Sequence, residues 1–326
     1  MAVRVALLSG GTGGAKLARG LLDVVGTDQL TVIANTGDDA EVHGAHVSPD
    51  PDLVTYWLAD VIDGRGYGIT DDTWEVMGAF EAAGRPAWFR LGDRDLAMCL
   101  VRTELLAAGR RLTEAHAAVV EGMGVRARVL PMCDEPVRTM IQAGGRSLGF
   151  QEFMIAEGAQ GPIEGLEFAG ASRASPTPEV LAAVAEADVL VIGPSNPVAS
   201  IGPILAVPGM PEALRAAAAP VVAMSPFVDG EVVKGPTRLF CDHAGLEPGA
   251  SAMLGAYGDL LDGVVADEPV QGVAALETDT MMDGPEARRR VAAATLELAQ
   301  SLAPQALGEE RRPKVVPAST GSILSG

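Results

Sequence analysis

A glycine-rich turn near the start of the chain has the composition of a phosphate-binding loop. Ser9-Gly10-Gly11-Thr12-Gly13-Gly14 follows the apolar run 3–8 and precedes a stretch with apolar residues at helical spacing. Glycines let the backbone approach a phosphate, and a side chain at Gly13 would stand between the two. The turn departs from the dinucleotide and Walker motifs, since Lys16 replaces the third glycine of the first and Ala15-Lys16-Leu17 the Gly-Lys-Ser/Thr of the second. The alternative is a tight turn that serves only packing.

Two pairs of aspartates follow at short distance along the chain. Asp38 and Asp39 come after a second apolar run, 30–34, and Asp50 and Asp52 lie in Ser48-Pro49-Asp50-Pro51-Asp52. Clustered carboxylate oxygens suit Mg²⁺, which would neutralise a diphosphate. We therefore expect a magnesium site that includes Asp38 and Asp50. The alternative is a solvated acidic turn with Asp52 as a helix cap.

Other polar residues give weaker indications. His43 and His46 are three positions apart in a glycine-containing turn, whereas zinc-binding helices place histidines at i and i+4. Arg90, before Asp93 at the expected start of a helix, suits a phosphate or carboxylate partner, or a surface ion-pair network. The three cysteines are far apart and show neither a disulfide framework nor a CxxC spacing: Cys99, Cys133 and Cys241.

The candidate turns stand at the ends of expected strands. Strand, glycine turn, helix and second strand within the first 35 residues form a βαβ unit, and the same rhythm resumes after residue 178, with a third polar turn at 193–197. In parallel sheets, ligands bind beyond the carboxyl ends of the strands. Patterning predicts helices at 52–62, 73–83, 93–108, 113–123, 178–187, 251–260 and 286–302, and strands at 126–130, 188–192, 220–224 and 263–266. A hairpin is expected at 139–149, within a small subdomain at about 138–171.

Composition restricts the class of protein. The chain has 326 residues, 48% of them apolar, and a formal net charge of −19. This predicts a globular domain and disfavours nucleic acid as a partner. No apolar run is long enough for a membrane span and no signal peptide is visible, so we expect a cytoplasmic protein. We expect one catalytic domain at 1–303 and a partly disordered tail at 304–326.

Several segments taken together resemble a known family, the 2-phospho-L-lactate transferases of coenzyme F-420 biosynthesis, whose actinobacterial members are called phosphoenolpyruvate transferases. The resemblance runs from about residue 3 to residue 300 and depends on the order of its motifs. These are Ser9-Gly10-Gly11-Thr12-Gly13, Asn35-Thr36-Gly37-Asp38-Asp39, Ser48-Pro49-Asp50-Pro51-Asp52, Leu91-Gly92-Asp93-Arg94-Asp95, Gly193-Pro194-Ser195-Asn196-Pro197, Ser200-Ile201-Gly202-Pro203-Ile204-Leu205 and Pro208-Gly209-Met210. Many relatives have leucine where this chain has Pro51.

The resemblance implies a fold and a reaction. The fold is α/β, a Rossmann-like parallel sheet with helices on both faces and an inserted smaller α+β region, commonly in a homodimer. The reaction joins the deazaflavin alcohol Fo to a guanosine-diphospho-linked three-carbon acid, makes a phosphodiester at the terminal ribityl hydroxyl and releases GMP. The ion is Mg²⁺. The sequence leaves open whether the acid is lactyl, enolpyruvyl or glyceryl.

The resemblance also assigns residues. Gly10, Gly11, Thr12 and Gly13 would lie against the donor diphosphate, and Ser195 and Asn196 would meet its guanosine side. Asp38 would hold or approach Mg²⁺, Asp52 would lie near Fo or the ion, and Arg90 near Fo. Because Fo is a flat tricycle, we also expect the segment 50–95 to cover the site with at least one aromatic ring, the alternative being that these aromatics only pack the core. The aromatics are Trp57, Trp74, Trp88 and Phe89. Asp38, Asp50 and Asp52 all remain candidates for orienting the attacking hydroxyl.

Two other classes of protein compete with this interpretation. A nicotinamide-dependent oxidoreductase would have a complete glycine fingerprint and an acidic residue directly after the second strand, where this chain has Asn35. A non-catalytic nucleotide-binding regulator would not need so many aspartates around one phosphate site.

Overall fold

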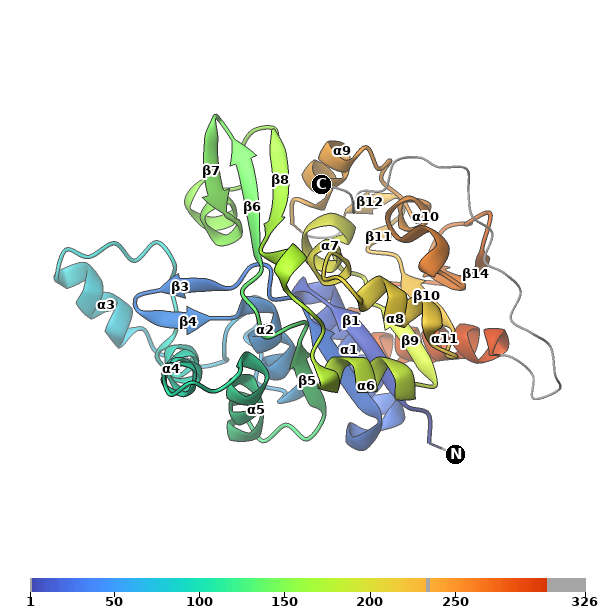
Figure 1. Cartoon of the computed structure of the whole chain (residues 1–326), viewed down its shortest axis with the longest axis horizontal. Helices are drawn as coiled ribbons and strands as arrows, with labels where there is room; N and C mark the ends of the chain where they lie inside the picture. The colour runs from blue at the N-terminus through green and yellow to red at the C-terminus, as the bar shows by residue number, and fades with distance from the viewer. Residues whose placement is uncertain (1, 233–234, 304–326) are drawn as a thin grey trace.

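Seven short apolar strands form one parallel sheet in the order β14-β13-β10-β9-β1-β2-β5. The computed structural model describes residues 2–232 and 235–303 (Figure 1). The strands are β1 (Val5–Ser9), β2 (Leu30–Ala34), β5 (Arg128–Pro131), β9 (Val189–Ile192), β10 (Val221–Met224), β13 (Gly263–Ala266) and β14 (Ala274–Glu277). Most of their residues are buried and apolar, as expected for a sheet covered on both faces.

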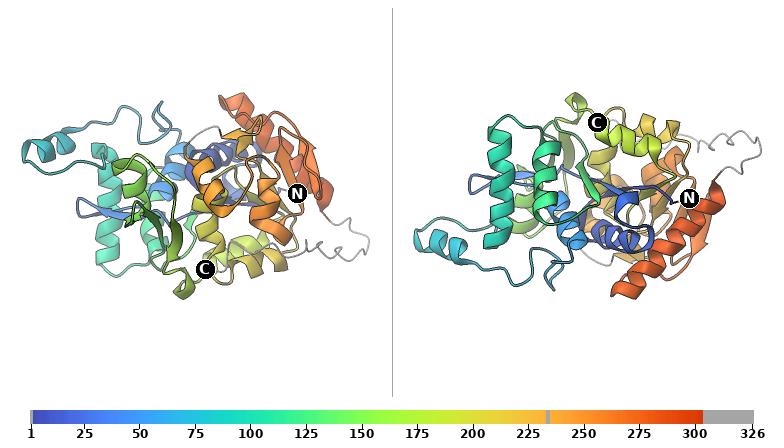
Figure 2. Two further views of the ribbon diagram at one scale, coloured as in Figure 1. Left: turned by 90° about the horizontal axis from the view of Figure 1, so that it is seen from above. Right: turned by 90° about the horizontal axis from the view of Figure 1, so that it is seen from below.

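Helices cover both faces of the sheet. Alternate residues of β1 belong to different cores: Leu7 packs on one face and Leu8 on the other, because successive side chains of a strand point in opposite directions. On the Leu7 face lie α1 (Gly11–Val25), α2 (Pro49–Leu58) and α11 (Pro285–Leu302). On the Leu8 face lie α6 (Pro178–Glu186), α7 (Gly202–Leu205), α8 (Met210–Ala216), α9 (Thr237–Ala244) and α10 (Ala252–Tyr257). Figure 2 shows α1 and α11 together on one side and α6 on the other.

The order of the strands reverses between β1 and β9. From β1 the chain builds outward to β2 and β5, and from β9 it builds the other way to β10, β13 and β14. The strands β1 and β9 are neighbours, and the loops that follow them therefore run in opposite directions. Such a switch point is where open α/β sheets bind ligands.

Smaller elements surround the carboxyl ends of the strands. An antiparallel sheet, β7-β6-β8, is formed by β6 (Arg138–Ala143), β7 (Arg146–Gly149) and β8 (Gly165–Ala169). A hairpin of β3 (Ala40–Val42) and β4 (Ala45–Val47) extends toward an outer lobe with α3 (Glu75–Ala82) and α4 (Asp93–Ala107), and α5 (Leu112–Gly122) follows (Figure 1). Beside α9 lie β11 (Phe227–Val228) and β12 (Glu231–Val232).

The predicted α/β class with a parallel sheet and two helical layers is confirmed. The predicted helices and strands occur, mostly within one to three residues of their expected ends. The strands β3, β4, β11, β12 and β14 and the helices α7, α8 and α9 were not predicted. The helix expected at 251–260 ends at Tyr257 and continues as a 3-10 turn at Gly258–Leu260. The tail 304–326 lies outside the described residues. Among the helices described, none combines the length and apolar character needed to cross a membrane.

Candidate functional site

A cavity of about 400 Å³ opens at the switch point. The loop after β1 forms one wall, the loop after β9 a second, and Asp38 and Asp50 part of the floor. The remaining lining is mostly apolar and comes from Phe150, Met154, Met224, Val228, Phe240, Met281 and Met282. The cavity therefore has a polar part at the strand termini and an apolar part, to which α9 contributes Phe240 and the segment after β7 contributes Phe150 and Met154.

The glycine turn is packed against the loop after β9. A Cβ at Gly13 would lie 2.0 Å from the carbonyl oxygen of Pro194, and one at Gly14 2.8 Å from Ser195 Oγ. The Gly10 N–H donates to Ser195 Oγ at 3.2 Å. The small size of Gly13 therefore serves the contact with Pro194, and the expectation that it also admits a phosphate stays a prediction. The first turn of α1 still lines the cavity through Thr12 and Gly13, at the helix end that favours a phosphate.

Asp38 and Asp50 are brought together by a side chain that the sequence placed at a strand end. Asn35, directly after β2, donates from Nδ2 to Asp38 Oδ1 at 3.1 Å and to Asp50 Oδ2 at 3.0 Å. The Gln151 amide, from the inserted region, donates to the other oxygen of Asp38 at 3.2 Å. The Gly11 N–H donates to Asp50 Oδ1 at 2.6 Å, which ties this carboxylate to the glycine turn. Expected site residues from three segments thus meet at one end of the cavity.

The two carboxylates are costly to ionise together. Burial raises the pKa of Asp38 well above its ordinary value, and the nearby charges of Asp50 and Asp39 raise it further. Burial also raises the pKa of Asp50 to about 6, against the lowering effect of the Asn35 and Gly11 hydrogen bonds. Among the ion pairs formed by the described residues, none involves either carboxylate. A cation between them would remove this cost.

Asp52 occupies a different environment from the one expected. Both of its oxygens accept hydrogen bonds from the Arg102 guanidinium, each at 2.7 Å, and the two side chains are almost completely buried. His116 Nδ1 lies 3.9 Å from Asp52 Oδ1, and burial lowers the pKa of His116 to about 4, so the ring is neutral at pH 7. Asp52 does not line the cavity. On α2, Asp50 and Asp52 point in different directions because two residues cover about 200° of a helix.

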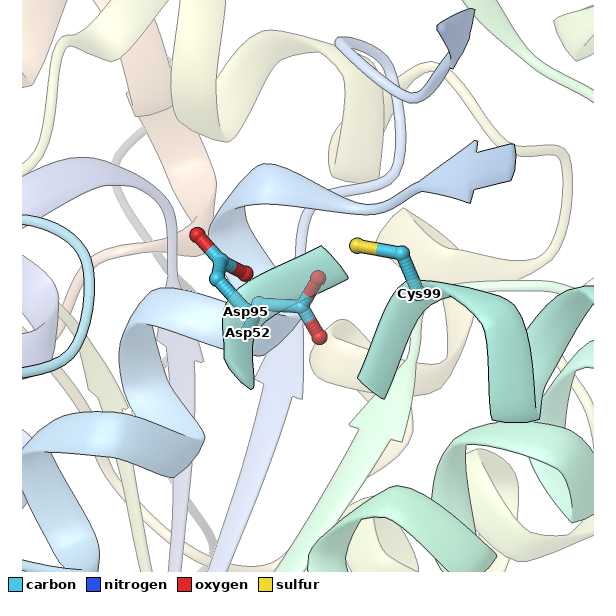
Figure 3. A group of neighbouring side chains, drawn as sticks. All are labelled: Asp52, Asp95 and Cys99. Atoms are coloured by element: carbon cyan, nitrogen blue, oxygen red, sulfur yellow. The ribbon is translucent and has the colours of Figure 1, made fainter. Parts of the chain in front are cut away.

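Asp52 also belongs to a cluster with Asp95 and Cys99, whose ligand atoms lie within 4.8 Å of one another (Figure 3). This spacing alone would suit a metal. However, Asp52 is held by Arg102, and Asp95 accepts a hydrogen bond from the Tyr56 hydroxyl at 2.7 Å. The Arg102 guanidinium already supplies the positive charge. The cluster therefore serves as a buried polar support that joins α2 to α4.

Arg90 also lies away from the cavity. It is on the outer lobe, where it pairs with Glu81 at 3.0 Å and stacks over the ring of Trp74 at 5.4 Å. Both partners of the ion pair are about half exposed. The expected aromatic cover is likewise not at the cavity, since Trp74 and Phe89 pack in the lobe's own core. The aromatic rings that do line the cavity are Phe150 and Phe240, with centroids 6.0 Å apart.

Ser195 and Asn196 both line the cavity, as expected for the donor site. The Asn196 Oδ1 accepts the N–H groups of Val198 and Ala199, at 2.9 and 3.0 Å, so it caps the turn that follows β9. His46, from the histidine pair, lies between Asp39 and Glu41 with 3.0 Å contacts on both ring nitrogens, which leaves neither nitrogen for a metal.

Sequence reasoning missed several residues of the site. The bridging role of Asn35 gave no signal beyond its place after a strand. Arg102 had one signal: it is a charged residue on the face of a helix that also carries Leu96 and Cys99, both buried. Thr280, Met281 and Met282 gave none, because they reach the cavity from the segment before α11.

Comparison with known proteins shows the family of this chain. The family described as 2-phospho-L-lactate transferase CofD matches residues 5–296. The chain belongs to the 2-phospho-L-lactate transferase family. It is 41% identical to a phosphoenolpyruvate transferase from Kitasatospora aureofaciens, over 92% of this chain and 99% of that protein. It is 36% identical to a 2-phospho-L-lactate transferase from Methanosarcina mazei, over 88% and 97%.

Comparison with solved structures concerns the fold. A crystal structure of a UPF0052 family protein from Bacillus halodurans matches with a TM-score of 0.60 and 18% identity, over 91% of this chain and 99% of that one. At this identity the likeness shows only the fold. Family membership confirms the sequence-based expectation of a transferase of coenzyme F-420 biosynthesis.

The substitution Asp38→Asn should stabilise the ligand-free transferase and impair its activity. The pKa of Asp38 is raised on folding, so ionisation opposes folding as the pH rises above the ordinary value of 3.8. Asparagine keeps the Asn35 contact through its Oδ1, and its NH₂ group can donate to the oxygen of a reversed Gln151 amide. Thermal unfolding at pH 7.5 should shift upward, the gain should vanish near pH 4, and turnover should fall at least about tenfold.

Asp63→Asn is a matched control for this pH dependence. Hydrogen bonds from Arg65 lower the pKa of Asp63, so the charged form of Asp63 stabilises the folded state. Asp63→Asn should therefore lower the unfolding temperature at pH 7.5 and leave turnover unchanged. A loss of stability at pH 7.5 in Asp38→Asn would show that the buried charge of Asp38 is already compensated.

A second pair of variants tests whether Asp52 is structural. Asp52→Ala leaves the Arg102 guanidinium buried without a counter-charge and should cost about 3–5 kcal/mol of unfolding free energy. The double variant Asp52→Leu/Arg102→Met removes both charges and should regain part of this loss, as measured by urea unfolding. Its turnover should stay within about tenfold of the parent's. A double variant that folds like the parent but is inactive would show that Asp52 takes part in the reaction.

Proposed function

We propose that this transferase joins Fo to a guanosine-diphospho-linked three-carbon acid and releases GMP, with Mg²⁺ as its ion. The terminal ribityl hydroxyl of Fo attacks the phosphorus that carries the acid. The bond from that phosphorus to the oxygen of the GMP phosphate breaks, and the hydroxyl proton leaves to a carboxylate. Operation as a cytoplasmic homodimer is part of the same proposal.

One observation supports the proposal most strongly. A helix N-terminus suited to a diphosphate and a pair of buried carboxylates meet at the switch point, joined by the 2.6 Å hydrogen bond from Gly11 to Asp50. Phosphoryl transfer is mainly positioning and charge neutralisation. Donor phosphates at the N–H groups of α1 would therefore lie beside the carboxylates that act on the acceptor.

The residues at the polar end of the cavity fit a magnesium ion. Asp38 and Asp50 are oxygen ligands of the kind Mg²⁺ prefers, and burial, which raises the pKa of both, makes a neighbouring cation favourable. When bound, the ion would neutralise charge on the diphosphate. Lys16 is the one cationic side chain among the described residues of the cavity wall. Its Nζ lies 3.8 Å from Asp283, and it can approach the donor phosphates.

The apolar end of the cavity suits a flat ring. Phe150 and Phe240, with the methionines around them, offer an apolar wall, which a heteroaromatic ligand needs together with a few polar anchors. Since Asp52 is held by Arg102, Asp38 and Asp50 are the carboxylates available to orient the attacking hydroxyl. The oxidoreductase alternative loses support here, because Asn35 is committed to these two aspartates and not to a ribose.

The reaction can be tested directly with purified components. Fo and each of the lactyl, enolpyruvyl and glyceryl guanosyl donors are mixed with the protein, and GMP release and the phosphodiester product are followed by chromatography. Product should form in Mg²⁺ and be lost in excess chelator. Thermal stabilisation by NAD without any product from the three donors would overturn the proposal.

The substitution Thr12→Asp separates donor binding from folding. Thr12 lines the cavity in the first turn of α1, where a carboxylate is favourable to the helix dipole but repels a diphosphate. Unfolding temperature should be equal to or above that of the parent. Affinity for the guanosyl donor, measured by calorimetry, should fall at least about tenfold, or about 1.4 kcal/mol.

Thr12→Asn is the uncharged control and should bind the donor within a few-fold of the parent. Equal donor affinity in Thr12→Asp and Thr12→Asn would place the diphosphate away from this helix.

A further inference from the structure

We infer that Asn35 is a positioning residue that makes Asp38 and Asp50 into a single cation-binding pair. The inference rests on the proposed magnesium-dependent function and adds to it a residue that itself contacts neither substrate nor reacting atoms. It follows from three hydrogen bonds that a single buried amide makes at the end of β2.

The contacts of Asn35 use its whole amide. The side chain is 1% exposed, and its Nδ2 donates to one oxygen of each carboxylate, at 3.1 Å for Asp38 and 3.0 Å for Asp50. Its Oδ1 accepts the N–H of Gly37 at 2.7 Å. Because Gly37 supplies a donor, the oxygen of the amide must face it and the NH₂ group must face the carboxylates. The orientation is therefore fixed by the backbone.

No other described side chain makes hydrogen bonds to both carboxylates. Gln151 donates to Asp38 alone, and the Gly11 N–H to Asp50 alone. Asp38 follows β2 while Asp50 is in the first turn of α2, with the β3–β4 hairpin between them. Among the described side chains, the Asn35 amide is therefore the direct hydrogen-bond link between the two carboxylates.

A neutral amide is the group that suits this task. It draws two negatively charged groups together through two N–H donors, yet adds no positive charge that would compete with a cation. A lysine would neutralise the pair and displace the ion, whereas an apolar side chain would let the carboxylates move apart. Partners that orient metal ligands in this way commonly change metal affinity by 10–100-fold when they are removed.

The test compares Asn35→Ala with Gln151→Ala, which removes a contact to only one carboxylate. Without substrates, Mn²⁺ binding is measured by calorimetry as a probe of the cation site. Affinity should fall at least about tenfold in Asn35→Ala and clearly less in Gln151→Ala. In the transferase assay, the Mg²⁺ concentration for half-maximal turnover should rise in the same ratio. Saturating Mg²⁺ should restore most of kcat, and the KM for the donor should change little.

Asn35→Ser gives a second measurement if Asn35→Ala does not fold. Its hydroxyl can donate to one carboxylate at a time, so its Mn²⁺ affinity should lie between those of the parent and a variant without a donor. Equal Mn²⁺ affinity in the parent and in the folded Asn35 variants would overturn the inference while leaving the proposed function intact. A parent that binds neither Mn²⁺ nor Mg²⁺ would overturn both the inference and the proposed ion. Product formation by such a parent would still support the transfer reaction.

Discussion

The carbonyl oxygen of Pro194 lies where a side chain at Gly13 would have to be, and the site depends on this close approach of two loops. It brings the ends of β1 and β9 together at the point where the strand order reverses. Ser195 then meets the Gly10 N–H, and Gly11 reaches Asp50. The glycine turn is thus fixed from two sides before any ligand arrives, and the N–H groups of α1 are held in place at the cavity.

The buried carboxylates of Asp38 and Asp50 lower the stability of the folded protein. The two carboxylates are buried together, and because folding raises both pKa values, their ionisation opposes folding as the pH rises above the ordinary value of an aspartate. Strained electrostatics of this kind are common at functional sites. At Asp50 the Asn35 amide and the Gly11 N–H lower this cost without removing it, and we propose that a bound cation offsets the remainder.

A second group of buried charges, the Asp52–Arg102 ion pair, is compensated within the protein, unlike Asp38 and Asp50. The Asp52–Arg102 pair is satisfied by two hydrogen bonds, and Arg102 also donates to the carbonyl of His46. It links α2, which carries Asp50, to α4 and to the β3–β4 hairpin. Two aspartates two residues apart on one helix therefore differ completely in role, because one faces the cavity and the other faces a guanidinium.

The sequence by itself determined the α/β class, most helices and strands, the family and the loops that build the site, since apolar periodicity and ordered glycine and aspartate motifs are local properties of the chain. It could not separate Asp50 from Asp52, because their surroundings come from Arg102 and Gly11, which are distant in sequence. Arg90 was expected near the acceptor, but packing on Trp74 and Glu81 holds it on the outer lobe. Phe150 and Phe240 reach the cavity from separate segments. Only the tertiary structure decided these points, because which side chains share a cavity depends on contacts between segments that no local pattern records.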